Sequence, residues 1–144
     1  MDGVSLDSYK VVNPREFSYV PDTSRRGDKI ALAFNNSNKA VLVSSIYTTF
    51  KCNRNDLLIP EFLFMLFDRP EFDRYARFNS WGSAREVFTM DDMNDVEIPI
   101  PNIKVQQEIV NIHKCYIKRQ RIADTLKEQI NNICPVLIRG SFEE

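Results

Sequence analysis

The sequence predicts an α+β protein: a small domain with a mixed or antiparallel sheet and short helices, followed by a long C-terminal coiled-coil helix. Three observations predict it. Up to about Asn53 the chain is rich in β-branched and aromatic residues separated by turn formers. After Ile59 the apolar residues take helical spacing. After Pro101 a regular spacing by threes and fours continues as far as Leu137.

Short strands are predicted along the first part of the chain. The segments 9–12, 16–20, 29–34, 39–45 and 47–52 contain the residue types that strands favour. Turn formers such as Asn13-Pro14, Pro21-Asp22 and the polar run 35–38 separate them. Because several strands follow one another through short turns, we expect an antiparallel or mixed sheet.

The segment 59–78 predicts two short helices that are separated near Arg69. Its apolar residues have helical spacing, and Pro60 and Pro70 both suit the first turn of a helix. A polar, glycine-containing loop follows at 79–86. Thr89, with Asp92 three residues later, resembles a capping box and predicts one helical turn. Residues 96–100 are predicted as a strand whose prolines suit a strand end or sheet edge.

The longest regular element is predicted from about residue 104 to residue 134, with Asn102 as its N-cap. Such a helix would be roughly 45 Å long at 1.5 Å per residue, and Pro135 is expected to end or kink it. An amphipathic helix lying across its own sheet is one interpretation. The length and the heptad spacing favour a coiled coil with another helix, in which only Arg119 is polar on the seam. The predicted helix–helix interface comprises Ile109, Ile112, Tyr116, Arg119, Ala123, Leu126, Ile130, Ile133 and Leu137.

Length and composition place limits on the class of protein. A chain of 144 residues with 43% hydrophobic and 27% charged residues suits one globular domain. The net charge of -1 excludes a globally basic nucleic-acid binder but allows a local basic face. We expect a cytoplasmic protein, because there is no signal peptide or membrane-spanning run and three scattered cysteines indicate reduced thiols.

Motifs for catalysis or metal binding are not found in the sequence. The four glycines form no phosphate-binding loop, and the single histidine, His113, lies within the predicted long helix. His113 and Cys115 lack the further ligands that a tetrahedral zinc site needs. We therefore expect no metal, no catalytic residues and no enzymatic activity in this chain.

Polar and basic residues gather at two places in a way that suits DNA binding. Arg and Lys can hold phosphates, while Arg can pair with guanine and Asn with adenine. Charged turns are also commonly just solvated, and Arg85 beside Glu86 could simply brace its loop. The candidate DNA-binding residues are Arg25, Arg26, Lys29, Asn35, Asn36, Asn38, Lys39, Arg74, Arg77, Asn79, Trp81, Ser83 and Arg85.

Several of these segments together resemble the specificity subunit of type I restriction–modification enzymes. The resemblance covers nearly the whole chain and is carried by the Gly-x-x-Arg sequence at 82–85, the Ile-Pro-Ile-Pro sequence at 98–101 and the Gln-Gln-Glu-Ile helix start at 106–109. Residues 43–50 match a further sequence pattern of this family, with Ile46 in place of the proline in that pattern.

The resemblance implies a DNA target recognition domain at 1–101 and a spacer or dimerisation helix with its tail at 102–144. Such a module would read one half of a bipartite double-stranded DNA target and dock the methyltransferase subunits through its helix. S-adenosylmethionine, ATP and magnesium would be bound by the methyltransferase and restriction subunits, which would carry the DNA methylation and endonuclease activities. No cofactor would be bound by this chain.

The family's subunit usually carries two recognition domains and two spacer helices, whereas this sequence holds one of each. It also starts without the N-terminal segment that usually opens the recognition domain. We therefore expect a homodimer, or pairing with another half-specificity chain through the long helix. The alternative is a truncated half-subunit that acts as a dimerisation or interaction protein without competent DNA recognition.

Overall fold

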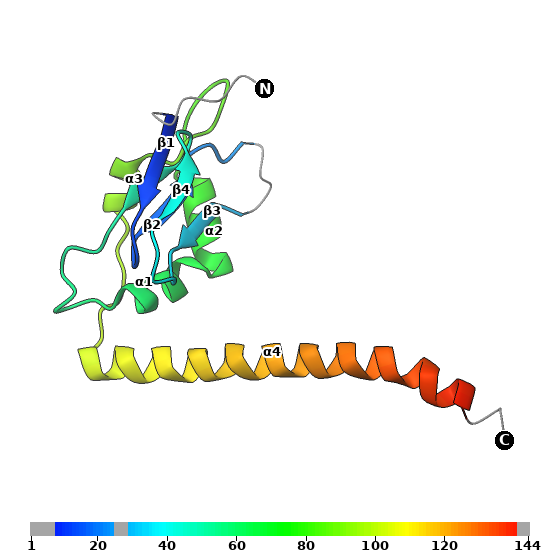
Figure 1. Cartoon of the computed structure of the whole chain (residues 1–144). Helices are drawn as coiled ribbons and strands as arrows, with labels where there is room; N and C mark the ends of the chain where they lie inside the picture. The colour runs from blue at the N-terminus through cyan, green and yellow to red at the C-terminus, as the bar shows by residue number, and fades with distance from the viewer. Residues whose placement is uncertain (1–7, 25–28, 141–144) are drawn as a thin grey trace. The chain divides into compact units, whose positions relative to one another are not determined.

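The computed structural model describes residues 8–24 and 29–140, which fall into two compact units (Figure 1). The first unit is Met1–Gln106 and the second is Gln107–Glu144. The first unit contains all the strands and three short helices, and the second is helical throughout its described part. The α+β class predicted from the sequence is confirmed.

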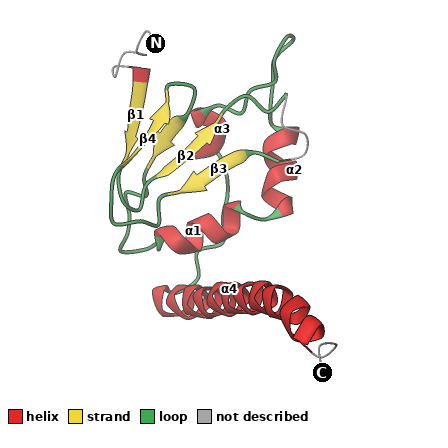
Figure 2. Ribbon diagram, turned by 45° about the vertical axis from the view of Figure 1, so that its right-hand side comes forward, coloured by secondary structure: helices red, strands yellow, loops and turns green. Residues whose placement is uncertain are grey.

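All five described strands pair in an antiparallel manner, in two small sheets (Figure 2). The two-stranded sheet pairs β1 (Tyr9–Val12) with β4 (Val41–Ser44). In the three-stranded sheet, β2 (Phe17–Val20) lies between β3 (Ala31–Phe34) and β5 (Thr48–Phe50). Each strand falls within a segment predicted from the sequence, and the antiparallel form of that prediction is the one observed.

The short helices begin where the prolines and the capping box predict. Helix α1 (Pro60–Phe67) and helix α2 (Pro70–Phe78) each start with a proline at the first turn, and the break lies at Asp68 and Arg69. Helix α3 (Met90–Asn94) is capped reciprocally by Thr89 and Asp92. The backbone N–H of Thr89 donates to Asp92 Oδ2 at 2.7 Å, and that of Asp92 donates to Thr89 Oγ1 at 3.2 Å.

Aromatic side chains form the core of the first unit. Phe17 is fully buried, and its ring centroid lies 4.9 Å from that of Phe34 and 4.8 Å from that of Phe50. This cluster joins all three strands of the larger sheet, because each ring comes from a different strand. On α2, Phe72 continues the core toward Phe88, with the two centroids 6.3 Å apart. Aromatic pairs at these distances add to the stabilisation that burial alone provides.

The prediction of a strand at residues 96–100 is wrong, because this segment forms no strand. Pro99 and Pro101 lack the backbone N–H that a β-ladder requires, so the segment offers only part of a pairing edge. The carbonyl of Pro101 instead accepts a hydrogen bond of 2.7 Å from the Gln106 side chain.

The Gln106 side chain is fully buried and uses its amide oxygen and both its donors. Its Nε2 donates to the carbonyls of Leu57 and Pro101 at 2.8 and 2.7 Å. Its Oε1 accepts from the N–H of Ile59 at 2.9 Å. Ile59 is the N-cap residue of α1. Gln106 therefore links residues 57–59 and Pro101 to the start of the long helix through one side chain.

Helix α4 (Ile103–Gly140) has 38 residues, or roughly 57 Å at 1.5 Å per residue. Its N-cap is Asn102, as predicted, because Asn102 Oδ1 accepts from the N–H of Lys104 at 2.9 Å. The helix does not end near Cys134 but continues through Pro135, so of the two predicted effects of this proline, an end or a kink, the kink is observed. A proline removes one hydrogen bond and bends the axis, and Figure 1 shows the last turns of α4 bending. The part of the chain that the structure describes contains no helix that is apolar and long enough to cross a bilayer.

Candidate nucleic-acid interface

The loop that follows α2 is closed at its base by a short antiparallel bridge. Trp81 and Val87 exchange two backbone hydrogen bonds of 3.1 and 2.9 Å. Between them Gly82 has a φ of 141°, and a Cβ added there would lie 2.0 Å from the carbonyl oxygen of Arg85. Only glycine fits this position. The Gly-x-x-Arg sequence therefore produces a compact loop, named here the 81–87 loop.

The 81–87 loop is fixed to α2 and to the segment after β2. Arg77 Nη1 donates to the carbonyl of Thr23 at 3.0 Å and lies 2.8 Å from Glu86 Oε2. The N–H of Thr23 donates to the carbonyl of Glu86 at 3.0 Å. Arg77 therefore connects α2 to both neighbouring segments. This geometry gives Arg77, one of the candidate DNA-binding residues, a structural role in holding the loop.

The tip of the 81–87 loop is exposed. Ser83, Ala84 and Arg85 all face solvent, and Trp81 at the loop's base is 69% exposed. Within residues 8–24 and 29–140, Arg85 makes no ion pair. The bracing function considered for Arg85 in the sequence is performed by Arg77 instead. The Arg85 guanidinium is thus available to bind a phosphate or a base edge.

Further basic residues lie around α2. Arg74 is exposed on the helix and pairs weakly with Glu71 at 3.5 Å. Lys29 is exposed, and the N–H of its neighbour Ile30 donates to Asp73 Oδ1 on α2 at 3.1 Å. Lys29 is therefore held near α2 although it is far from that helix in sequence. The candidates Arg25 and Arg26 lie outside the described residues.

The asparagine-rich turn between β3 and β4 is built around Asn35. Asn35 is buried, its Nδ2 donates to the carbonyls of Val12 and Lys39, and its Oδ1 accepts from Ser37. These hydrogen bonds hold the turn together, and they leave the Asn35 amide little capacity to form hydrogen bonds with a DNA base. Asn36, Asn38 and Lys39 are exposed.

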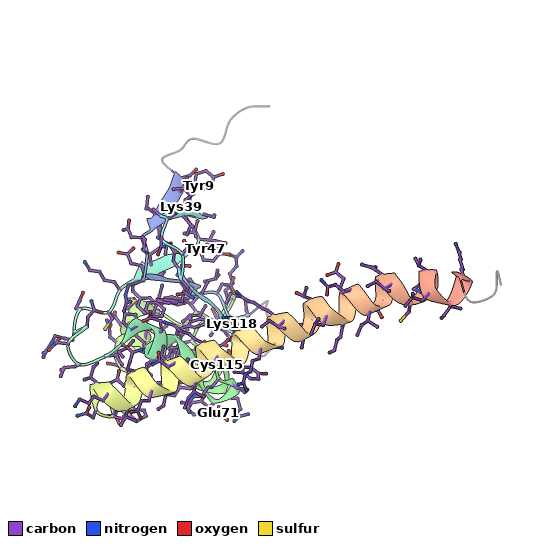
Figure 3. All side chains as sticks on the ribbon, turned by 60° about the horizontal axis from the view of Figure 1, so that its bottom comes forward. Tyr9, Lys39, Tyr47, Glu71, Cys115 and Lys118 are labelled. Atoms are coloured by element: carbon purple, nitrogen blue, oxygen red, sulfur yellow. The ribbon has the colours of Figure 1, made fainter. Side chains whose placement is uncertain are left out.

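The candidate residues separate into two groups. Lys29 precedes β3 and the asparagine turn follows it, so the two lie at opposite ends of that strand. Figure 3 shows Lys39 well separated from Glu71 at the start of α2. The structure therefore brings Lys29, Arg74, Arg77, Trp81, Ser83 and Arg85 into one group, and places Asn36, Asn38 and Lys39 in another.

Phe78 is an exposed residue near the 81–87 loop that sequence analysis missed. It is the last residue of α2 and is 81% exposed, the largest value among the exposed large hydrophobic residues. Its helical spacing from Arg74 puts both on one face. Asn79, a candidate, caps this helix end because its Nδ2 donates to the carbonyl of Tyr75 at 2.9 Å. The sequence gives little indication that Phe78 is exposed, because most phenylalanine side chains pack inside the protein.

The second unit presents the predicted seam of α4 to solvent. Ile109 is half-buried, and all later residues of the predicted helix–helix interface are exposed in the single chain. The structure contains one copy of the chain, so the coiled coil stays a prediction.

Among residues 8–24 and 29–140, Tyr19 is the titratable group with the largest pKa shift. Burial and the nearby carboxylates of Asp92 and Asp91 raise the pKa of Tyr19 to about 12, but this residue lies in the core. Among the described residues no three His, Cys, Asp or Glu side chains are grouped to hold a metal ion. The chemistry offered at the surface is that of hydrogen-bond donors, cations and aromatic rings.

A comparison with protein families matches residues 23–132 to the type I restriction modification DNA specificity domain. The match covers well over half of the chain and includes the 81–87 loop and most of α4. The comparison with curated proteins gave no match.

Proposed function

The chain belongs to the family of type I restriction–modification DNA specificity domains, and from this premise we propose that it reads one half of a bipartite target and docks methyltransferase subunits through α4. Recognition of a DNA sequence is the role of the family. Beyond this family role, we propose which surface of the chain contacts DNA and which subunits α4 binds.

The observation that supports this assignment best is the 81–87 loop. Its Gly82 turn, its bridge between Trp81 and Val87, and its ion pair between Arg77 and Glu86 hold the backbone in place. Arg85 extends from this fixed loop into solvent. An arginine on a rigid support is suited to a bidentate contact with guanine O6 and N7.

Positive charge around the loop supports the same assignment. Lys29 and Arg74 are exposed, and the bond between Ile30 and Asp73 holds Lys29 near α2. Contacts to phosphates position a protein on DNA, and contacts to base edges provide the sequence specificity. We assign Lys29 and Arg74 to the phosphates and Arg85 to the bases.

The catalytic steps belong to partner subunits in this proposal. S-adenosylmethionine would be bound by the methyltransferase subunit, and ATP and magnesium by the restriction subunit. The chain itself would recognise the target sequence and provide a helix of about 57 Å that carries the docking surface.

A second candidate function is that of an interaction protein whose helix binds partners without DNA recognition by the domain. The exposed apolar seam of α4 supports it, because that seam requires a partner whether or not DNA is bound. The net charge of -1 also gives the chain no general affinity for DNA.

Arg85→Ala tests the first assignment. We expect affinity for DNA to fall several-fold or more, and the slope of log K against log salt to decrease by about 1 if a phosphate contact is lost as well. Fluorescence anisotropy with labelled duplexes at several salt concentrations measures both, with the methyltransferase subunit present.

Arg54→Ala is the matched control, because Arg54 is an exposed arginine whose partner Asp56 lies two residues away in another loop. Both variants should unfold at the temperature of the parent chain. Equal DNA affinity for the Arg85 variant and the parent would refute the assignment of Arg85. Absence of binding to any DNA at low salt would favour the interaction protein.

A further inference from the structure

Two aromatic side chains at the end of α2 are uncovered. Phe78 and Trp81 are 81% and 69% exposed, more than any other aromatic residue that the structure describes. Within residues 8–24 and 29–140 neither ring contacts another aromatic ring, whereas Phe72, Tyr75 and Phe88 pack against one another. Because most large aromatic side chains are substantially buried, two exposed rings three residues apart indicate a surface that binds something.

The backbone that carries the two rings is held in place. The N–H of Asn79 and the hydroxyl of Ser80 donate to carbonyls of the preceding turn of α2 at 3.0 and 2.6 Å. The N–H of Trp81 donates to the carbonyl of Val87 at 3.1 Å. A ligand that covers the rings therefore has little backbone to order, which favours binding.

The two rings lie close enough together to contact the same short stretch of DNA. Three peptide units separate the Cα atoms of Phe78 and Trp81, so these atoms are at most roughly 11 Å apart. That distance corresponds to about three base-pair steps of a duplex at 3.4 Å per step.

The charge around the rings indicates which ligand covers them. Residues 74–85 contain three arginines and no acidic residue. Arg77 is used by Glu86, but Arg74 has only a weak pair with Glu71 and Arg85 has no ion pair within the described residues. A ligand with anionic groups beside flat aromatic faces suits this surface. Nucleic acids combine phosphates and bases in this way, and aromatic rings with arginines are their usual binding groups.

The faces of the bases are the part of DNA that the two rings fit. In a fully paired duplex each base face is covered by its neighbours, and only base edges are accessible in the grooves. A face becomes accessible when an apolar side chain such as phenylalanine inserts at a base step, or when a base leaves the stack. Phe78 suits this role because its ring extends from the end of a helix with little protein around it.

We propose that Phe78 and Trp81 stack on bases of the bound DNA that have lost a neighbour in the duplex. Arg74 and Arg85 lie in the same segment and hold the DNA around the opened position. The inference rests on the proposed function, since it specifies how the DNA-reading surface holds its target. It makes local opening of the duplex part of recognition by this domain.

Affinity for opened and closed DNA tests the proposal. The full-length chain is titrated, by fluorescence anisotropy at low salt, into two labelled duplexes of the same mixed sequence, one of which carries a single unpaired adenine. We expect the parent to prefer the duplex with the unpaired base by about tenfold, because a base that is already unpaired costs least to unstack. Phe78→Ala and Trp81→Ala should each weaken binding to this duplex by about tenfold through loss of stacking.

Two further variants at Phe78 separate stacking from simple apolar contact. Phe78→Tyr keeps an aromatic face and should bind like the parent, whereas Phe78→Leu should bind as weakly as Phe78→Ala. Neither alanine nor leucine at this position should change the slope of log K against log salt, whereas Arg85→Ala should decrease it by about 1. All variants should unfold at the temperature of the parent, because the Phe78 ring is exposed.

Tyr9→Ala is the matched control, because Tyr9 is an exposed aromatic residue on β1. Figure 2 shows β1 separated from α2 by the other strands of the first unit. This variant should bind both duplexes as the parent does. An equal loss of affinity for Tyr9→Ala and Phe78→Ala would overturn the assignment of stacking to the end of α2.

The fluorescence of Trp81 provides a direct measurement, because Trp81 is the one tryptophan in the sequence. Stacking of the indole on a base should quench its emission strongly when the full-length chain alone is saturated with the duplex that contains the unpaired adenine. Unchanged emission at saturation would overturn the proposed stacking of Trp81.

The results also separate this inference from the proposed function. If the parent binds DNA but Phe78→Ala binds both duplexes equally well as the parent, the stacking is wrong and the recognition role stands. If Phe78→Ala instead weakens binding of the methyltransferase subunit with DNA affinity unchanged, the two rings form a protein-docking surface and the inference is wrong. If the parent binds neither duplex at low salt, the recognition role fails, and the inference fails with it.

Discussion

The two units of this chain use apolar residues in opposite ways. In Met1–Gln106 the large aromatic residues Phe17, Tyr19 and Phe88 are fully buried. In the described part of Gln107–Glu144, the apolar residues after Ile117 are all exposed. A domain that buries its core within one chain folds by itself, while a helix with an uncovered seam needs another surface. Under the proposed function, the first unit would read DNA and the second would bind partner chains.

The largest effect is expected from removing the centre of the domain's core. Phe17→Ala should lower the free energy of unfolding by about 3–5 kcal/mol, because a buried ring and its contacts with Phe34 and Phe50 are lost. Phe78→Ala, the same change at an exposed ring, should alter it by less than about 0.5 kcal/mol. Urea denaturation measures both. A similar decrease in the free energy of unfolding for the two variants would contradict the distinction between buried and exposed aromatic residues.

A smaller loss is expected from Gln106→Leu. The change keeps the size of the side chain but leaves the N–H of Ile59 and the carbonyls of Leu57 and Pro101 without their partner, at a cost of about 2–4 kcal/mol. The adjacent Gln107→Leu is the control, because the Gln107 side chain is exposed and donates to Asn111. Thermal unfolding followed by circular dichroism compares them. An unchanged melting temperature for Gln106→Leu would show that its bonds contribute little.

Gly82→Ala should cost about 1–3 kcal/mol, because φ is positive at this position and the new methyl group would collide with the Arg85 carbonyl. DNA affinity should fall together with stability, since the 81–87 loop would have to rearrange. Gly140→Ala is the control, because nothing lies within 4 Å of a Cβ built there. If Gly82→Ala binds DNA as tightly as the parent, a fixed loop geometry is not needed for recognition.

The smallest effect on the domain is expected from Leu126→Asp. This change should abolish dimerisation in sedimentation velocity while leaving the unfolding of the first unit within about 0.5 kcal/mol of the parent. Asn132→Asp adds the same charge outside the predicted seam and should leave the dimer intact. Dimers that persist in Leu126→Asp would contradict the coiled coil.

Local sequence signals were sufficient for most elements of the fold. Pro60 and Pro70 mark the starts of α1 and α2, and the exchange of hydrogen bonds between Thr89 and Asp92 starts α3. These signals depend only on neighbours in sequence. The strand predicted at residues 96–100 failed because alternation of apolar residues does not show whether a pairing partner exists. The sequence left open whether Pro135 ends or kinks α4, and in the structure the helix continues past this residue.

The candidate site was predictable in composition but not in arrangement. The sequence identified Arg85 and Trp81, yet it did not show that Arg77, rather than Arg85, pairs with Glu86. It listed Asn35 among the DNA-binding candidates, whereas its amide is occupied by the turn. These distinctions depend on which of several possible partners each side chain reaches in the folded chain, as when Asn35 bonds to Val12, 23 residues away.

Selection of bound sequences from a random duplex DNA library measures directly whether this chain reads a DNA sequence. The full-length chain, with the methyltransferase subunit, is incubated with the library at low salt, and the retained duplexes are sequenced. We expect an enriched motif of two half-sites at one fixed spacing, which would form an inverted repeat if two identical chains pair about a two-fold axis. We also expect that Arg85→Ala loses or relaxes this motif. Retention of DNA without any enriched sequence would contradict the claim that this chain reads DNA.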